Sequence, residues 1–285
     1  MIADATTRRV ALIGYPLKRR HSETMHNAAF GHFSIPARYE LRELEPEAIT
    51  AFVHEARREG WLGFQITAPY KQAVMEHLDE IEAGAQKIGA VNSVLRREDG
   101  SLVGFNTDAP GFQRAAEGEL DIRFAGLRVA VAGAGGVARA VVYALVAAGA
   151  DSVVICDLDP SRAADLAAGY GAPVRSVAAG PEFEDCLSEV DFAVNATTVG
   201  MIQPGVAFEP SALSGSAAVF DLVYIPPETD LLQRARARGL AATNGLGMLV
   251  AQAEIAFERW TGVAGSGPIM RAALAADPGV DQTGA

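Results

Sequence analysis

The sequence has no apolar run long enough to cross a membrane and no leader typical of export. A membrane-spanning helix needs about 18 or more consecutive apolar residues. The longest apolar segment, "AVVYALVAAGA" (residues 140–150), is shorter and ends in glycine and alanine, like a buried helix. The first residues, "MIADATTRRVALIGY", lack the charged, apolar and small-residue order of a signal peptide. We therefore expect a cytoplasmic protein with no membrane partner.

Cysteine and positive charge are also scarce. Cys156 and Cys186 have no spacing typical of a disulfide framework or a metal site. His21, His26 and His32 form no metal-ligand pattern, so no metal is expected, and we interpret His26 as a packing or loop-bracing histidine. The net charge of -11 argues against nucleic acid as a partner. The expected partner is a small-molecule substrate, bound by a monomer or a homodimer.

What the sequence has in quantity is apolar side chain in short runs. Hydrophobic residues make up 49% of the 285 residues and charged residues 21%, as in a folded globular protein. The runs alternate with amphipathic stretches, which is typical of an α/β protein. The predicted strands are residues 9–15, 37–44, 62–67, 91–98 and 101–106, then 127–133, 152–157, 191–197 and 217–224; the predicted helices include residues 46–58, 136–149, 160–168, 228–238 and 246–260.

The two sets of strands differ in kind. The strands of the second set are continuous apolar runs, as expected where helices cover both faces of a parallel sheet. In the first set, charge interrupts the strand at 37–44, and residues 91–105 predict a hairpin that turns at Asp99-Gly100. Proline and glycine break the pattern near residue 110 ("TDAPGF") and glycine again near 244 ("TNGLG"). These breaks predict domain boundaries.

A glycine-rich turn joins a strand to a helix in "RVAVAGAGGVARAVVYAL" (128–145). Gly133, Gly135 and Gly136 lie at the turn, and Ala138 takes the place of a third small residue. Such a turn exposes backbone N–H groups at a helix N-terminus, where a pyrophosphate binds. The next strand ends in Asp157, about 20 residues further on, which is the context that a dinucleotide site requires.

The residues after the next strands bear on the choice of cofactor. Asp157 is expected to accept hydrogen bonds from the ribose hydroxyls of NAD and to repel the 2′-phosphate of NADP, so NAD is predicted over NADP. Asp159 adds negative charge or caps a helix before Pro160, and Arg162 is the nearby cation. In "NATTVGM" (195–201), Asn195 and Thr197 either hydrogen-bond the cofactor or brace their own loop.

The stretch "GFQITAPYKQAV" (63–74) places a lysine just beyond a buried strand. Lys71 is either an ordinary solvated lysine or a proton carrier mounted on the core.

Together, several segments resemble the shikimate dehydrogenase family. They run in family order over nearly the whole chain: "HNAAF" (26–30), "QITAPYK" (65–71), "GAVNSV" (89–94), "GFNTDAPGF" (104–112), "GAGGVARA" (133–140), "NATTVGM" (195–201), "DLVYIPPETDLL" (221–232) and "GLGMLVAQAEIAFERWTG" (245–262). The resemblance implies two domains: an α/β substrate domain of residues 1–110 plus 246–285, and a Rossmann-like, doubly wound NAD(P)-binding domain of residues 111–245.

The resemblance also implies a reaction and its residues. The reaction is reversible hydride transfer between a nicotinamide cofactor and a carboxylated cyclic polyol, shikimate to 3-dehydroshikimate or quinate to 3-dehydroquinate. Lys71 and Asp108 match the catalytic pair. The residues implied to bind substrate are Ser22, Thr67, Asn92, Tyr224 and Gln252, and Arg20 is added as a hypothesis because it stands where the family has a serine. The residues implied or predicted to bind the cofactor are Gly133, Ala134, Gly135, Gly136, Val137, Asp157, Arg162, Asn195, Ala196, Thr197, Leu222, Gly245 and Met248.

The sequence departs from the family pattern at several of these places. Where the family has two serines before its first helix, this chain keeps Ser22 but has Arg20 at the first serine and Glu23 at the following proline. Arg20 either grips the substrate carboxylate or belongs to a solvated basic loop. Gln65 replaces the usual asparagine, and "DLD" (157–159) replaces the usual "NRT". A paralogue with another hydroxy-acid substrate, or a non-catalytic NAD-binding protein, are the alternatives.

Overall fold

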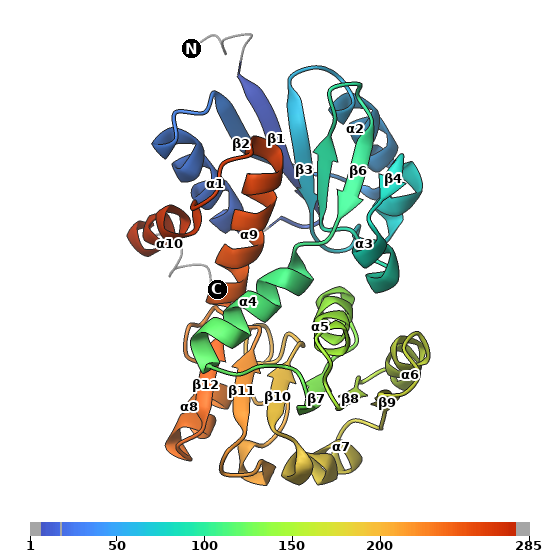
Figure 1. The fold of residues 1–285 in the computed structure, drawn as a ribbon, viewed down its shortest axis with the longest axis vertical. Helices are drawn as coiled ribbons and strands as arrows, with labels where there is room; N and C mark the ends of the chain where they lie inside the picture. Colours follow the sequence, from blue (N-terminus) through green and yellow to red (C-terminus); the bar gives the residue numbers. More distant parts are fainter. Residues whose placement is uncertain (1–6, 18, 278–285) are drawn as a thin grey trace. The chain divides into compact units, whose positions relative to one another are not determined.

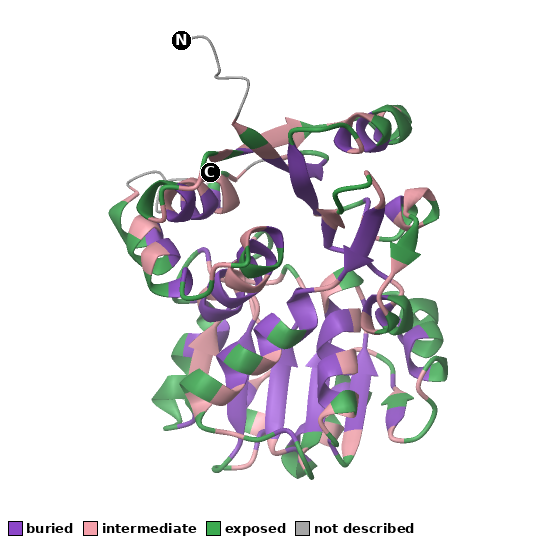
Figure 2. Cartoon of the chain, turned by 45° about the horizontal axis from the view of Figure 1, so that its top comes forward, coloured by how far each residue is buried: buried purple, intermediate pink, exposed green. Residues whose placement is uncertain are grey.

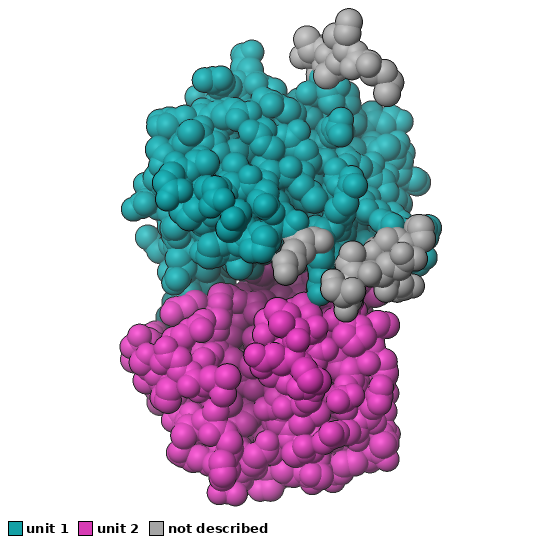
Figure 3. All heavy atoms as spheres, turned by 180° about the vertical axis from the view of Figure 1, so that it is seen from behind, with its two compact units in different colours: residues 1–107, 250–283, 285 teal, residues 108–249, 284 magenta. Residues whose placement is uncertain are grey.

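The computed structural model describes residues 7–17 and 19–277 and divides them into two compact units, drawn in different colours in Figure 3. The first comprises the described residues up to Thr107 and from Val250 onward, and the second runs from Asp108 to Leu249. The predicted boundaries were near residues 110 and 245. Within the described ranges, no helix is long and apolar enough to cross a membrane.

The first unit is built on a mixed six-stranded sheet, in the order β2-β1-β3-β5-β6-β4. Strands β1, β2 and β3 are mutually parallel where they pair, and β5 runs antiparallel to both β3 and β6. The strands are β1 (Arg8–Gly14), β2 (Ala37–Glu43), β3 (Trp61–Ile66), β4 (Glu80–Ile81), β5 (Ser93–Arg96) and β6 (Leu102–Phe105).

Helices of the first unit come from both ends of the chain (Figure 1). They are α1 (His21–His32), α2 (Ile49–Ala56), α3 (Ala83–Ile88), α9 (Leu246–Thr261) and α10 (Gly267–Ala276), with short 3₁₀ turns η1 (Pro46–Ala48) and η2 (Ala73–His77). Helix α9 begins in the second unit and continues in the first, because the division at Val250 falls within it. The C-terminal part of the chain thus completes the first unit.

Strand β3 is buried on both faces and sends different side chains to each. Phe64 and Ile66 join the apolar core that contains Phe52 of α2. Alternate residues of a strand face opposite ways, so Gln65 points to the other face, where its amide meets helix α9. The face toward α2 is therefore apolar, whereas the face toward α9 carries polar groups.

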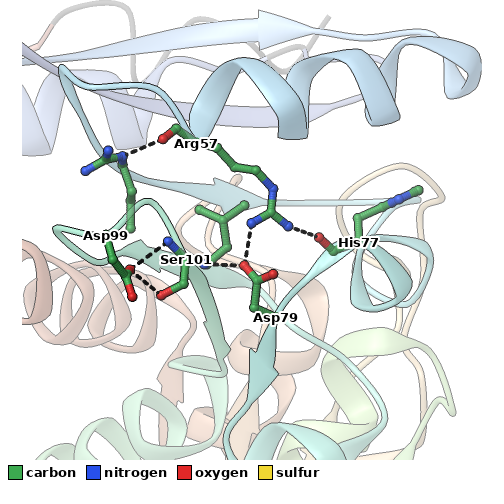
Figure 4. Close-up of polar contacts among 7 residues, drawn as sticks. Arg57, His77, Asp79, Asp99 and Ser101 are labelled. Atoms are coloured by element: carbon green, nitrogen blue, oxygen red, sulfur yellow. Dashed lines mark hydrogen bonds and ion pairs between the residues drawn. The ribbon is translucent and has the colours of Figure 1, made fainter.

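The predicted hairpin at Asp99-Gly100 is present and is held by charged residues (Figure 4). The Asp99 carboxylate accepts hydrogen bonds from the Ser101 amide (2.9 Å) and hydroxyl (2.7 Å). Arg57, just after α2, pairs with Asp79, whose carboxylate also accepts the Leu102 amide at 2.7 Å. Arg57 thereby ties helix α2 to the start of β6.

The second unit is an all-parallel six-stranded sheet in the order β12-β11-β10-β7-β8-β9. Its strands are β7 (Arg128–Ala132), β8 (Ser152–Cys156), β9 (Val174–Ser176), β10 (Phe192–Asn195), β11 (Ala218–Asp221) and β12 (Ala241–Asn244). The chain proceeds from β7 to one side of the sheet and from β10 to the other. The strand order therefore reverses between β7 and β10, which is where ligands bind in doubly wound sheets.

Helices cover both faces of this sheet, which is drawn as largely buried in Figure 2. On one face Phe112 of α4 (Asp108–Leu120) packs against Phe192 and Phe220, with ring centroids 6.2 and 5.2 Å apart. On the other, side chains of α7 (Pro181–Cys186) and α8 (Asp230–Ala237) share a core with β7, β10 and β11. Helices α5 (Gly136–Ala147) and α6 (Pro160–Ala168) follow β7 and β8. The predicted doubly wound α/β fold is confirmed.

The predicted break at "TDAPGF" lies in the first turn of α4, next to the division after Thr107, and Pro110 is tolerated there because the first N–H groups of a helix have no partner within it. Several predicted strand ends were wrong. Observed strands are shorter than predicted at 91–98, 191–197 and 217–224, since the residues that follow them form turns. Strands β4, β9 and β12 and helices α3, α7 and α10 were not predicted from the sequence.

Candidate active site

Lys71 is fixed to the first unit by the turn that precedes it. Thr67 ends the buried strand with its amide donating to Ile13 (2.9 Å), and the Tyr70 amide closes the turn onto the Thr67 carbonyl at 3.1 Å. The Tyr70 ring is buried, and its hydroxyl donates to the Leu44 carbonyl at 2.6 Å. The Lys71 carbonyl accepts the Val91 amide at 2.8 Å. The lysine backbone is therefore anchored on both sides, while its side chain is only half-buried.

Asn92, expected to hold a substrate hydroxyl, is buried in a polar frame next to that anchor. Its Oδ1 accepts the Thr107 amide at 2.8 Å, and its Nδ2 donates to the Thr107 hydroxyl at 3.0 Å. The same hydroxyl lies 3.3 Å from Oε1 of Gln252, on helix α9. Asn92 and Gln252 are distant in sequence but share one intermediary, Thr107, which is completely buried.

Behind Gln252 lies a second polar group, centred on Gln65. Gln65 Nε2 donates to Gln252 Oε1 at 2.9 Å, and its own Oε1 accepts the Tyr39 hydroxyl at 2.7 Å. His26 stacks on the Tyr39 ring, with centroids 4.5 Å apart, and its Nε2 lies 3.2 Å from Gln65 Oε1. Burial lowers the pKa of His26 to about 3, opposed by the hydrogen bond with Gln65. The packing role predicted for His26 is confirmed.

The start of helix α1 carries the departures from the family pattern. Arg20 precedes the helix with its side chain 77% exposed, and its Nε donates to the Glu23 carboxylate at 2.7 Å. The two unusual residues therefore form one ion pair. Ser22 is half-buried, and its hydroxyl hydrogen-bonds the Tyr39 phenol. To bind a substrate carboxylate, Arg20 would have to leave the carboxylate of Glu23.

The glycine turn of the second unit has the geometry of a phosphate-binding loop. Gly133 has φ +107°, and a Cβ there would lie 2.8 Å from the Ala196 carbonyl. Helix α5 begins at Gly136 with Gly135 as its N-cap and no side chain capping it. Val137 follows in the first turn, and Ala138 is buried against the sheet. Backbone N–H groups at such an uncapped N-terminus suit a pyrophosphate.

Asp157 braces this turn. Its carboxylate accepts the Ala134 amide at 2.7 Å and the Asp159 amide at 3.0 Å. Asp159 is the N-cap of α6, accepting the Ser161 amide at 3.0 Å, so the predicted capping role is present. Arg162, in the first turn of α6, has a guanidinium nitrogen 3.6 Å from where a Gly135 Cβ would stand. A cation therefore lies beside the glycine turn.

The loop after β10 is held by its own side chains. Asn195 accepts the Thr197 hydroxyl at 2.7 Å and donates to the Asp221 carboxylate at 2.8 Å. The Thr197 hydroxyl in turn accepts the Val199 amide at 3.1 Å. The loop-bracing alternative left open for Asn195 and Thr197 is thus present. Burial raises the pKa of Asp221, which also accepts the Thr229 hydroxyl at 2.6 Å.

The remaining predicted residues of the second unit follow the last two strands. Gly245 comes directly after β12, and a Cβ there would lie 2.2 Å from the Leu222 carbonyl, so only glycine fits. Met248 is buried in the first turn of α9, and Tyr224 is half-buried in the loop after β11. Asp108, the expected partner of Lys71, is the buried first residue of α4. It belongs to the second unit, whereas Lys71 belongs to the first.

Three family models match this chain. They are described as the shikimate dehydrogenase substrate binding domain (residues 12–94), shikimate / quinate 5-dehydrogenase (residues 114–202) and the shikimate 5'-dehydrogenase C-terminal domain (residues 245–275). A shikimate dehydrogenase (NADP(+)) of Geobacillus kaustophilus is 39% identical over 254 residues, 88% of this chain and 91% of the relative. The chain belongs to the shikimate dehydrogenase family.

Solved structures of this family have the same fold. The shikimate 5-dehydrogenase of Thermus thermophilus, in complex with NADP(H) and shikimate, matches with a TM-score of 0.85 and 37% identity, covering 94% of this chain and 98% of that chain. The quinate dehydrogenase of Corynebacterium glutamicum, in complex with NAD, matches with a TM-score of 0.89 and 36% identity, covering 95% and 99%. NAD(P) is therefore the cofactor class of the family.

Three residues that brace the candidate site residues of this chain were not predicted from the sequence. Thr107 links Asn92 to Gln252, and Asp221 braces two loops at the carboxyl edge of the second sheet. Gln65 was noted only as a mild change of residue type. The signal for Asp221 was a lone carboxylate in a buried apolar strand, as its last residue, since a buried charge requires partners.

Proposed function

We propose that this protein is a shikimate dehydrogenase, which oxidises shikimate to 3-dehydroshikimate and catalyses the reverse reduction, with NAD(P) as cofactor. The observation that carries the proposal is the frame that holds Lys71, Asn92 and Gln252 in the first unit. Lys71 is tied to Val91, the neighbour of Asn92, and Asn92 reaches Gln252 through Thr107. One connected set of hydrogen bonds thus holds a base and two amide side chains, which are the groups that a polyol substrate requires.

Lys71 is the proposed acid–base group. When hydride leaves the carbinol carbon, the hydroxyl proton must pass to a base, and in reduction the developing alkoxide needs a proton. The Lys71 amine takes the proton in one direction and the ammonium returns it in the other. Asp108 is proposed to orient Lys71 and stabilise its charged form. Asn92 and Gln252 hold ring hydroxyls, with Thr67 and Tyr224 as further substrate contacts.

The second unit is proposed to hold the dinucleotide, which when bound supplies the hydride acceptor or donor. The absence of room for a Cβ at Gly133 and the uncapped N-terminus of α5 fit a pyrophosphate. The residues proposed to line the site follow the carboxyl ends of β7, β8, β10, β11 and β12; they are Gly133, Ala134, Gly135, Gly136, Val137, Asp157, Arg162, Asn195, Ala196, Thr197, Leu222, Gly245 and Met248.

We infer a preference for NAD over NADP from the charges after β8. Two carboxylates, Asp157 and Asp159, follow the second strand of the dinucleotide fold against the single guanidinium of Arg162, and this excess of negative charge is what supports the proposal. The NAD-bound quinate dehydrogenase supports this proposal, whereas the curated relative is named for NADP(+). Asp159→Asn is the sharpest probe, because asparagine keeps the N-cap and removes only the charge. We expect the variant to gain activity with NADP relative to NAD.

Arg20 is a candidate contact of the substrate carboxylate. If it leaves Glu23 to grip the substrate carboxylate, Arg20→Ala raises the KM for shikimate; if it stays a surface pair, that KM is unchanged. Quinate is the second candidate substrate, favoured by the resemblance to a quinate dehydrogenase. Cytoplasmic location and oligomeric state stay predictions.

The test is absorbance at 340 nm with each pairing of NAD or NADP with shikimate or quinate. We expect shikimate-dependent reduction by the wild type and a loss of roughly 100-fold or more in kcat for Lys71→Ala, the scale of one general acid–base group. Cofactor affinity, measured by fluorescence titration, is expected to persist in the variant. Unimpaired turnover by Lys71→Ala would refute the role of the lysine. A wild type that binds NAD but oxidises neither substrate would indicate the non-catalytic alternative or another hydroxy acid.

A further inference from the structure

A single chain of hydrogen bonds connects the proposed substrate residues of the first unit. From Asn92 it passes through Thr107 to Gln252, then through Gln65 to Tyr39, with Nδ2–Oγ1, Oγ1–Oε1, Nε2–Oε1 and Oη–Oε1 distances of 3.0, 3.3, 2.9 and 2.7 Å. All five residues are buried. Ser22 hydrogen-bonds the far end of the chain, at the Tyr39 phenol.

Two donors at the Tyr39 end decide which atom donates and which accepts in each of these hydrogen bonds. Burial raises the pKa of the Tyr39 phenol above its ordinary value, so the phenol keeps its proton and donates it to Gln65 Oε1. His26 is neutral, and its Nε2 faces the same oxygen at 3.2 Å, so the imidazole proton resides on Nε2. Two donors therefore meet at Gln65 Oε1. The amide nitrogen of Gln65 must then face the other way, toward helix α9.

That orientation is passed on to Gln252. Gln252 Oε1 receives the Gln65 amide at 2.9 Å and lies 3.3 Å from the Thr107 hydroxyl. The oxygen and nitrogen of a primary amide lie on opposite branches, so the NH₂ branch of Gln252 is directed away from Gln65. Gln252 then offers a donor, and not an acceptor, to a hydroxyl oxygen of a polyol.

We propose that Gln65 is a positioning residue that fixes which end of the Gln252 amide faces the substrate. This inference rests on the proposed function, in which Gln252 holds a ring hydroxyl. Asparagine, the usual residue of the family at this position, is one methylene shorter, by about 1.5 Å of covalent reach. An asparagine cannot reach both Tyr39 and Gln252 as Gln65 does. The series of hydrogen bonds from Tyr39 through Gln65 to Gln252, which we call the relay, therefore depends on the glutamine that this protein has at position 65.

Gln65→Glu is the decisive substitution. A carboxylate accepts from Tyr39 and His26 but has no proton to give Gln252, so the Gln252 amide must turn its nitrogen inward and present its oxygen. We expect the KM for shikimate to rise about 10- to 100-fold, because Gln252 then presents its oxygen where it had presented a donor to the substrate hydroxyl. The dissociation constant for NAD should be unchanged. Gln86→Glu adds the same charge at an exposed position of the same unit and should leave both constants as in the wild type.

A double-mutant cycle separates positioning from mere loss of structure. Gln252→Ala alone raises the KM for shikimate; adding Gln65→Glu to it should change that KM less than twofold, since no amide is left to turn. An equal effect of Gln65→Glu in both backgrounds, or none in the wild type, overturns the inference. Gln65→Asn should raise KM only a few-fold, because it breaks the relay without reversing it.

A readout without substrate distinguishes failure of this inference from failure of the proposed function. In protein with ¹⁵N-labelled glutamine side chains, hydrogen exchange of the Gln65 amide should be much slower than that of exposed Gln86, and should accelerate in Gln252→Ala. If the wild type oxidises no shikimate while the Gln65 amide is protected in this way, the function is wrong and the relay stands. If Gln65 exchanges as fast as Gln86, the relay is wrong.

Discussion

Replacing His26 by glutamine should flatten the dependence of the first unit's stability on pH. His26 has no exposed surface, stacks on Tyr39 and lies 5.3 Å from the Trp260 ring. Burial lowers its pKa from the ordinary 6.5 to about 3. Between these two values the unfolded chain binds a proton that the folded chain does not, so stability falls as the pH falls.

The magnitude follows from the two pKa values. The contribution of His26 is fully present above pH 6.5 and is lost progressively as the pH drops toward 3. The loss approaches about 1.4 kcal/mol per pH unit, which integrates to about 2 kcal/mol between pH 7.5 and pH 5. His26→Gln cannot titrate. It is expected to be less stable than the wild type at pH 7.5, by a difference that shrinks by about 2 kcal/mol at pH 5.

The chain supplies its own probe for this measurement. Its two tryptophans, Trp61 and Trp260, both belong to the first unit, so their fluorescence in urea reports unfolding of the unit that contains His26. Phe30→Leu is the matched control, because Phe30 is buried in the same aromatic cluster, 5.1 Å from Phe257, and does not titrate. Its curve should lie below that of the wild type by the same amount at every pH.

Parallel curves for His26→Gln and the wild type between pH 7.5 and pH 5 would refute the reasoning. They would mean that the imidazole is charged or hydrated in the folded state, so that the Gln65 oxygen meets a cation instead of a neutral donor.

Two glycines give further predictions. Gly63→Ala should lower the free energy of unfolding of the first unit by about 3 kcal/mol or more, because the new Cβ would lie 2.0 Å from a backbone carbonyl of β5. Gly31→Ala, in α1 with no atom within 4 Å of its Cβ, should raise it by about 0.5 kcal/mol in the same urea titration. Gly133→Ala should weaken NAD binding at least tenfold by fluorescence titration, since it clashes with the Ala196 carbonyl at 2.8 Å, whereas Gly118→Ala in α4 should not. Equal effects within either pair would contradict the close approaches.

Elements with a strong local signal were predictable from the sequence. The continuous apolar runs of β7, β8, β10 and β11, each short and bounded by turn residues, are typical of a parallel sheet covered on both faces. Strand β12 reads "AATN" and β9 reads "VRS", which carry no such signal. Both are strands because their backbone pairs with a neighbouring strand, as Ala241 to Asn244 pair with β11. Pairing of this kind is a property of the fold and not of the local sequence.

For the site, the motifs located the residues but did not show which of their atoms already form hydrogen bonds within the protein. Asp157 was expected to serve a ribose, yet its carboxylate already accepts two backbone amides. A carboxylate has about four acceptor positions, so two remain, and Asp157 can brace the glycine turn and meet a ribose together. The Asn195 side chain, in contrast, makes four contacts within its loop and with Asp221. The Asn195 amide therefore stabilises the loop. A cofactor would be contacted by the backbone of this loop and not by the Asn195 side chain.

Arg20 and Gln65 show why departures from a family pattern need the fold to be interpreted. In sequence, Arg20 and Glu23 are two separate departures, one from a family serine and one from a family proline. In the structure their side chains form an ion pair, so their charges cancel. Gln65 was a conservative change in sequence, but it contacts Gln252 across 187 positions and orients it. The conspicuous change thus lies at an exposed ion pair, where charge is well solvated. The inconspicuous one lies in a buried network, where the direction of each hydrogen bond constrains the next. Substrate selection in this chain should therefore be more sensitive to Gln65 than to Arg20.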